Sequence, residues 1–267
     1  MPRVRVNGVE LYYSEQGSGP ETIVFSHSYI MNGEHFQPQI EALSGRYRCI
    51  AYDHRGHGRS EVPRAGYEMQ TIYADGVALI EALGCAPCHW VGLSTGGFVG
   101  LRVAIRRPEL LRSLVLMDTS ADEEPAAAAR QYRLLGHVVR FLGWRPVIGI
   151  AMSKLFGRKF LTDPARRAEV RAWRARIMAT DRYGARQFGL GIFSRDSVHA
   201  ELGRIKLPTL VMVGEKDVST PPARARRIAE GIEGAELVLV PDAGHLSTLE
   251  EPAAVNQALE RFLAAQG

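Results

Sequence analysis

Short apolar segments alternate with helix-like segments along most of this chain, and this alternation most constrains its fold. The apolar segments are continuous rather than alternating, as is typical of strands covered on both faces. Helical patterns between them predict βα units around a parallel sheet. At the N-terminus, two alternating segments flank Asn7-Gly8 and predict a β-hairpin. The strands expected from these patterns are residues 3–6, 10–14, 21–26, 48–52, 89–93, 112–117, 208–213 and 236–240.

One long segment breaks this rhythm. Residues 120–200 are rich in Ala and Arg, look helical throughout and contain no strand candidate. The segment lies between two strands that should be neighbours in the sheet. We therefore predict an α/β core domain of residues 1–119 and 201–267, with residues 120–200 inserted after the sixth strand as an all-helical cap. A chain of 267 residues is long enough for one such domain with a well-buried core.

The charge of the chain is unevenly placed. The formal net charge is +4, yet residues 121–196 contain 13 Arg and 2 Lys against 7 acidic residues, so the rest of the chain is net negative. Solvated helix faces explain such a segment; alternatively, a basic region near the site attracts anionic substrates. The charge is not interleaved with aromatic residues, so we expect no nucleic-acid binding.

No segment approaches the roughly 20 apolar residues that a membrane helix requires, so we expect no membrane partner. The first five residues begin directly on a strand-like alternation instead of an apolar signal segment, so we expect a cytoplasmic protein. The oligomeric state cannot be inferred from these patterns.

Two sets of residues suggest redox or metal chemistry, and we interpret both as structural. Cys85 and Cys88 form a CxxC pattern, but it precedes a strand, whereas a redox pair opens a helix after one. We predict a turn there. His54 and His57 lie close together in a glycine-rich loop, but no third ligand has suitable spacing. We expect neither a metal nor a cofactor.

The most informative motif is Gly92-Leu93-Ser94-Thr95-Gly96-Gly97, which lies between an apolar strand and a helix. In that context GxSxG predicts a sharp turn that lifts the Ser94 hydroxyl clear of the sheet, because a side chain at either flanking glycine would crowd the turn. The Thr95 N–H, at the start of the helix, can then point at a developing oxyanion. The alternative is an ordinary serine in a glycine-rich turn.

A serine hydroxyl needs an adjacent general base. We predict His245 for this role, because it follows the last apolar strand, where ligands meet open α/β sheets. Asp217, after the preceding strand, is the predicted acid that orients the imidazole. The order Ser94, Asp217, His245 is typical of α/β-hydrolases. Glu215 lies nearer the strand end and is less favoured, and Asp118 is a second possible acid position.

These motifs resemble those of the α/β-hydrolase superfamily, and within it those of the small cofactor-free esterases, perhydrolases and 3-oxoadipate enol-lactonases. The resemblance extends along nearly the whole chain and implies the α/β-hydrolase fold, with a mostly parallel eight-stranded sheet flanked by helices. Five motifs in the expected order carry it, at residues 25–29, 53–60, 92–97, 214–217 and 242–245.

The resemblance also implies a second oxyanion donor. Members of the family usually carry His-Gly after the third strand, and the next residue supplies an N–H. This implies that Tyr29 is the donor, although Ser28 stands where the family has glycine. The residues of the DxRGxGxS loop, 53–60 here, are structural in the family.

The predicted function is a serine esterase that cleaves small carboxylic esters through an acyl-enzyme. The main alternative is a lactonase acting on an enol-lactone, which suits the basic cap, or on an acyl-homoserine lactone. The latter would use apolar cap residues that equally suit the core of the cap, namely Phe141, Trp144, Ile148, Ile150, Met152, Leu155 and Phe156. Dehalogenases and epoxide hydrolases of this family place Asp where Ser94 stands. A hydrolase-like small-molecule receptor is the non-enzyme alternative.

Overall fold

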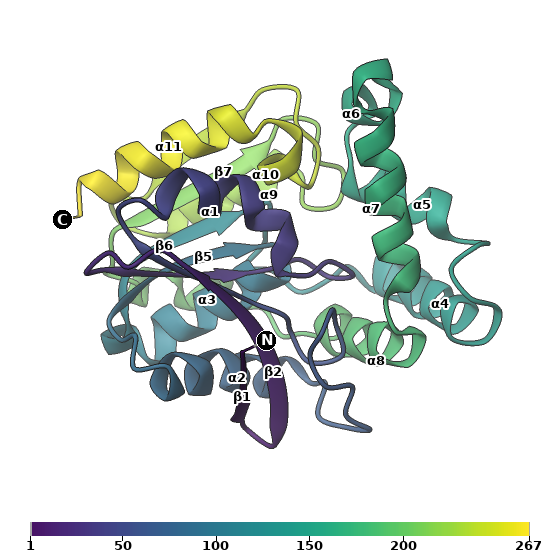
Figure 1. Ribbon diagram of the computed structural model, residues 1–267, viewed down its shortest axis with the longest axis horizontal. Helices are drawn as coiled ribbons and strands as arrows, with labels where there is room; N and C mark the ends of the chain where they lie inside the picture. The colour runs from purple at the N-terminus through teal and green to yellow at the C-terminus, as the bar shows by residue number, and fades with distance from the viewer. Residues whose placement is uncertain (1, 267) are drawn as a thin grey trace.

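The computed structural model describes residues 2–266 and contains one eight-stranded sheet with helices packed on both faces (Figure 1). Residues 1 and 267, the outer ends of the predicted core domain, lie outside the described residues. The order of the strands across the sheet is β1-β2-β4-β3-β5-β6-β7-β8. The strands are β1 (Arg3–Val6), β2 (Val9–Gln16), β3 (Thr22–Ser26), β4 (Arg48–Tyr52), β5 (Cys88–Leu93), β6 (Leu111–Met117), β7 (Thr209–Gly214) and β8 (Glu236–Val240).

The sheet combines an N-terminal hairpin with a parallel body. β1 and β2 pair antiparallel, with Asn7 and Gly8 between them at φ values of 46° and 75°. Two consecutive positive φ values suit the right-handed twist of a hairpin, so the predicted Asn-Gly turn is confirmed. β2 also pairs antiparallel with β4, and β4, β3, β5, β6, β7 and β8 run parallel. The fully buried β3, β5 and β7 explain the continuous apolar segments of the sequence.

Two layers of helices cover the sheet. Apolar residues of α2, α3 and α9 belong to one buried cluster, and those of α1 and α11 belong to the other. The core helices are α1 (Gln37–Leu43), α2 (Met69–Ala82), α3 (Thr95–Arg106), α9 (Pro222–Gly231), α10 (Ser247–Glu250) and α11 (Pro252–Ala264). Short 3₁₀ helices lie at Gly33–Phe36, Pro108–Leu110, Pro164–Arg166 and His199–Arg204.

The segment between β6 and β7 is helical, as predicted for a cap. It contains α4 (Ala126–Leu142), α5 (Ile148–Leu155), α6 (Arg158–Thr162), α7 (Arg167–Ala179) and α8 (Arg182–Phe193). These helices gather at one end of the molecule, on the right in Figure 1. The bounds 120–200 remain a proposal, supported by the chain leaving the sheet after Met117 and re-entering it at Thr209. Within residues 2–266, no helix is both long and apolar enough to cross a bilayer.

The apolar cap residues divide between two environments. Trp144, Ile150 and Leu155 line the pocket above Ser94 that is described below, so part of the cap faces the site. Ile148 and Met152 do not line that pocket and are buried in the cluster shared with α1 and α11, to which Trp144 and Leu155 also belong. Phe156 is also buried in that cluster, whereas Phe141 is 71% exposed at the end of α4. The interpretation as pocket wall therefore applies to Trp144, Ile150 and Leu155, and the interpretation as core of the cap applies to Ile148, Met152 and Phe156.

The CxxC segment lies where the chain passes from α2 into β5. Cys85 lies in the connection from α2 to β5, which contains a cis peptide bond between Ala86 and Pro87, and Cys88 is the first residue of β5. Both thiols are buried and unpaired. The segment leads the chain into a central strand.

Candidate active site

Ser94 occupies the turn between β5 and α3, in a backbone conformation that few residues adopt. Its φ is 54° and its ψ is −106°. Strained φ/ψ values persist where the surrounding structure holds them. Here the Ser94 N–H donates to the Met117 carbonyl over 2.8 Å, and the Ser94 carbonyl accepts from the Thr119 hydroxyl over 2.7 Å. The neighbouring strand β6 therefore fixes the turn.

The flanking glycines are required by close backbone contacts. A β-carbon at Gly92 would collide with the backbone of Gly96, and one at Gly96 would collide with the carbonyl of Ser26 at the end of β3. The turn therefore packs directly against a neighbouring strand, and no side chain fits between them. This is the physical reason for the GxSxG spacing in this chain.

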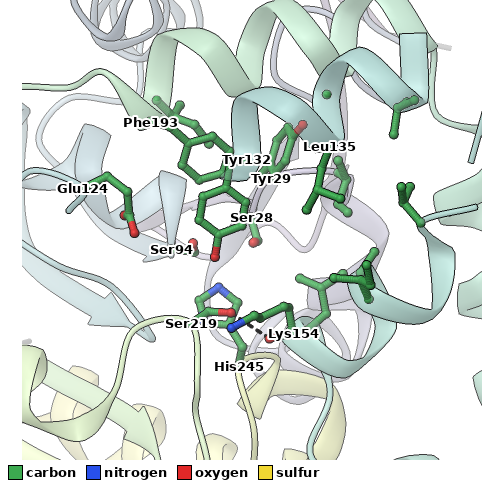
Figure 2. A pocket seen from close by; sticks show the side chains of 18 of the residues that line it. Ser28, Tyr29, Ser94, Glu124, Tyr132, Leu135, Lys154, Phe193, Ser219 and His245 are labelled. Carbon is green, nitrogen blue, oxygen red and sulfur yellow. Dashed lines mark hydrogen bonds between the residues drawn. The ribbon is translucent and has the colours of Figure 1, made fainter. Parts of the chain in front are cut away.

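His245 and Asp217 meet behind Ser94. His245 Nδ1 donates a hydrogen bond to Asp217 Oδ2 over 2.8 Å, and both side chains are almost fully buried. The other ring nitrogen then lacks a proton, and Figure 2 shows the imidazole with a nitrogen directed toward Ser94. Ser94 and His245 line the same pocket. The structure thus brings together three side chains that lie far apart in the sequence.

Asp217 is held by four donors. The N–H groups of Ser219 and Thr220 donate to Oδ1 over 2.7 and 3.0 Å, and the Thr220 hydroxyl donates to Oδ2 over 2.8 Å. Burial alone would raise the pKa of Asp217, but the His245 charge and these hydrogen bonds lower it. Burial likewise opposes protonation of His245, yet the Asp217 charge and hydrogen bond leave the pKa of His245 raised. The pair therefore stabilises an imidazolium.

The two alternative acids occupy different environments. Glu215 is exposed at the surface. Asp118 is fully buried and accepts hydrogen bonds from the Gly214 N–H over 2.8 Å and the Ser247 hydroxyl over 2.5 Å. Burial and the nearby Asp217 charge raise the pKa of Asp118 to about 8. Asp118 is therefore mostly neutral at pH 7 and bonded to groups other than His245, which favours Asp217 as the partner of the imidazole.

The two expected oxyanion donors come from two neighbouring connections: Thr95 follows Ser94 directly after β5, and Tyr29 follows β3, the strand next to β5. Thr95 is the first residue of α3, so its N–H has no acceptor within the helix. Tyr29 follows β3, and its hydroxyl donates to the Ala185 carbonyl of α8 over 2.8 Å. Ser28 does not have a positive φ. A serine therefore fits this position without backbone strain, although the family usually has glycine there.

The histidines of the neighbouring loops support this backbone. His57 Nε2 accepts from the Ile30 N–H over 3.2 Å, and His27 Nε2 accepts from the His54 N–H over 2.8 Å. Burial lowers the pKa of His54 to about 3 and that of His57 to about 4. Both rings are therefore neutral at pH 7: His57 accepts at Nε2, whereas His54 donates from Nε2 to the His27 carbonyl over 3.2 Å. Within residues 2–266, no cluster of three or more potential ligands has metal-binding geometry.

The pocket above Ser94 is apolar with a few polar groups. It has about 880 Å³ of space not filled by atoms, open mouth included. Its walls come mainly from α4, α5 and α8 of the cap, with Phe98 of α3 below. Its polar side chains are Ser28, Tyr29, Ser94, Glu124, Tyr132, Lys154, Ser219, Thr220 and His245.

Five of these polar residues were not predicted: Ser219 and Thr220, which follow Asp217, and three residues of the cap. Glu124 and Tyr132 lie at the start of the cap, and Lys154 lies in the last turn of α5. Their sequence neighbourhoods resemble any exposed helix, so no signal marked them as pocket residues. Of the 13 Arg and 2 Lys in residues 121–196, only Lys154 lines this pocket in the described part of the chain. The basic charge of the cap therefore lies mostly on solvated faces.

Comparison with known proteins identifies the family. A sequence model of the family described as the alpha/beta hydrolase fold matches residues 21–252, so the chain belongs to this family. The description of the family supports hydrolase activity. A curated relative, 3-oxoadipate enol-lactonase 2 from Acinetobacter baylyi, is 28% identical over 96% of this chain and 93% of its own length.

Two solved structures are similar to the whole chain. The enol-lactonase from Burkholderia xenovorans LB400 has a TM-score of 0.92 and 28% identity, covering 98% of this chain and 100% of that one. A thermophilic esterase from Thermogutta terrifontis has a TM-score of 0.93 and 27% identity, covering 100% and 99%. The predicted fold is confirmed, as is the predicted family.

Proposed function

We propose that this protein is a serine carboxylic-ester hydrolase in which Ser94, His245 and Asp217 form the catalytic triad. The observation that carries the proposal is their arrangement in one pocket: a serine in a strained turn faces an imidazole that is hydrogen-bonded to a buried carboxylate. Such an arrangement suits nucleophilic attack on an acyl carbon. The esterase relative with the same fold supports an ester substrate.

The mechanism follows from the protonation states. His245 takes the proton of Ser94 as the hydroxyl oxygen attacks the ester carbonyl, and Asp217 stabilises the resulting imidazolium. The N–H groups of Thr95 and Tyr29 hold the oxyanion. The imidazolium then protonates the departing alcohol, and water hydrolyses the acyl-enzyme with His245 again as the base. No metal or cofactor is required for any of these steps. Peroxide in place of water would give a perhydrolase side activity.

A lactone is the second candidate substrate, and one observation favours it. Lys154 places a cation at a pocket that also contains the proposed nucleophile. A carboxylate on an enol-lactone would be attracted to it. The similarity to two enol-lactonases agrees with this alternative.

Turnover of a substrate panel tests the proposal. We expect the wild type to hydrolyse p-nitrophenyl esters of short acyl chains, or lactones of the two kinds, with many turnovers per active site. Ser94→Ala should lose at least about 10³-fold in kcat, because the nucleophile is absent. Ser194→Ala is the matched control, since that exposed hydroxyl bonds only within its own helix.

The same experiment separates an enzyme from a hydrolase-like receptor. A receptor would release one burst of product and then hold a stable adduct, whereas an enzyme continues at a steady rate. Full activity of Ser94→Ala would refute the proposal.

The location in the cytoplasm remains a prediction, compatible with three buried cysteines that are unpaired.

A further inference from the structure

Tyr132 offers a hydroxyl to the pocket without using it in the fold. It lies on α4, and its ring stacks on Phe193 of α8 with centroids 4.1 Å apart and planes 11° apart. This stacking fixes the ring. Figure 2 shows the Tyr132 hydroxyl directed toward Ser94 and His245, and no dashed line reaches it from the other residues drawn. The hydroxyl is therefore a positioned group that can bind a substrate.

Glu124 lies in the same pocket and offers the complementary group. Its Oε2 lies 3.3 Å from an Arg195 nitrogen and 3.6 Å from an Arg224 nitrogen, and its side chain is only 9% exposed. Burial lowers the pKa of Arg195 to about 10, so that guanidinium stays charged at neutral pH. The two cations offset the cost of burying the carboxylate. Both contacts use Oε2, and Oε1 is free to accept a hydrogen bond from a substrate.

The state of Tyr132 fits a donor. Burial raises the pKa of Tyr132, and the nearby Glu124 charge raises it further, partly opposed by Arg224. The hydroxyl therefore stays protonated across the neutral range. Most of the remaining wall is apolar, including Leu135, Val139 and Ile192. Tyr132 and Glu124 therefore contribute one donor and one acceptor to the same mostly apolar pocket, which favours a ligand group that can both accept and donate a hydrogen bond.

We propose that Tyr132 and Glu124 form a polar subsite that recognises a neutral hydrogen-bonding group, a hydroxyl or a secondary amide, on the substrate close to its scissile carbonyl. Such a group accepts from Tyr132 and donates to Glu124. An anionic group is disfavoured there by the carboxylate, and a cationic one by Arg195 and Arg224. The inference rests on the proposed esterase or lactonase function and narrows its substrate class.

Matched substrate pairs test the subsite. Three polar esters are each compared with methyl hexanoate, which has the same chain length: methyl 2-hydroxyhexanoate, methyl 3-hydroxyhexanoate and methyl N-propionylglycinate. Hydrolysis is measured as proton release at constant pH. We expect the wild type to prefer at least one polar ester, and Tyr132→Phe to reduce that preference in kcat/KM about three- to tenfold, the value of one neutral hydrogen bond. Phenylalanine keeps the stacking on Phe193. Glu124→Gln should reduce the same preference by about tenfold or more, because its acceptor is charged.

Controls distinguish recognition from damage. Tyr183→Phe removes another cap hydroxyl, which bonds to the Arg64 carbonyl outside the pocket, and should leave the preference unchanged. Melting temperatures of all variants show whether the loss of charge at Glu124 disturbs Arg195. Methyl ketones with the same chains as these esters cannot be hydrolysed, so their binding can be measured by ligand-observed NMR. The ratio of the Kd of the apolar ketone to that of each polar ketone then gives the preference for a polar group.

The outcomes separate this inference from the proposed function. Hydrolysis that survives Ser94→Ala refutes the esterase mechanism, whereas the ketone Kd ratios still report on the subsite. A preference for polar ligands that changes less than twofold in both Tyr132→Phe and Glu124→Gln overturns the subsite. Loss of the preference in both variants, with Tyr183→Phe unchanged, supports it.

Discussion

Asp217→Asn gives the sharpest test of how the carboxylate works. The wild-type Oδ1 accepts from two backbone N–H groups, those of Ser219 and Thr220. An asparagine at this position must direct its carbonyl oxygen to the same two donors. An NH₂ group placed there would itself be a donor and could not accept a hydrogen bond from either N–H group. Its NH₂ group then occupies the place of Oδ2, opposite His245 Nδ1.

The consequence is the wrong histidine tautomer. The NH₂ group donates to Nδ1, so the ring proton moves to Nε2, and the imidazole can no longer accept the Ser94 proton. The carboxylate charge that stabilises the imidazolium is also lost. For serine hydrolases this change costs about 10⁴-fold in kcat, or about 5.5 kcal/mol of barrier. We expect a loss of about 10³- to 10⁴-fold here.

The assay is the steady-state kcat on a p-nitrophenyl ester, with the melting temperature measured alongside. Asp118→Asn is the matched control: it is the same isosteric change at a buried carboxyl beside the site, but one whose pKa is raised to about 8. Replacing a mostly neutral acid with an amide should change kcat less than about threefold. The assignment of the acid would be wrong if Asp217→Asn retained a tenth of the wild-type kcat. It would also be wrong if Asp118→Asn lowered kcat more than Asp217→Asn does.

Two further predictions follow from buried pairs of opposite charge. Because the pKa of His245 is raised above its ordinary value and the base must be neutral, log kcat/KM should fall with decreasing pH through a midpoint above about 6.5. A pH–rate profile with its acid midpoint well below that value would contradict this. The Arg55–Asp75 ion pair is 4% and 1% exposed, so Arg55→Ala should lower the free energy of unfolding by about 3–5 kcal/mol, because it strands a buried carboxylate. Denaturant unfolding measures this, and a loss below about 1 kcal/mol would show that water solvates Asp75.

The site residues on the sheet could be predicted because topology alone brings them together. Ser94, Asp217 and His245 each follow a strand of the parallel body, and parallel strands end at one edge. The sequence patterns located those strands to within one or two residues. Choosing Asp217 over Asp118 required only its place in the chain, and the hydrogen bonds of the structure now give the physical reason.

The cap residues of the pocket could not be predicted in this way. Helical periodicity shows which face of a helix is apolar, but Tyr132 and Lys154 lie at the border between that face and solvent. Their direction depends on how α4 and α5 rotate when they pack on the core. Glu124 precedes the cap helices, and its environment depends on Arg195, which lies 71 positions later. Such long-range pairings leave no trace in local patterns.

The loop that carries Tyr29 is held by both parts of the fold, which links the cap to the proposed chemistry. From the core side, His57 accepts the Ile30 N–H. From the cap side, the Ala185 carbonyl of α8 accepts the Tyr29 hydroxyl, and Gly189 is a glycine because a β-carbon there would press on the Tyr29 ring. A displacement of α8 would therefore move the backbone N–H that we propose as an oxyanion donor. Tyr132 stacks on Phe193 of the same helix, so α8 contacts both the Tyr29 loop and the proposed polar subsite. The substrate recognition in the cap and the oxyanion stabilisation at the sheet edge that we propose thus share one helix.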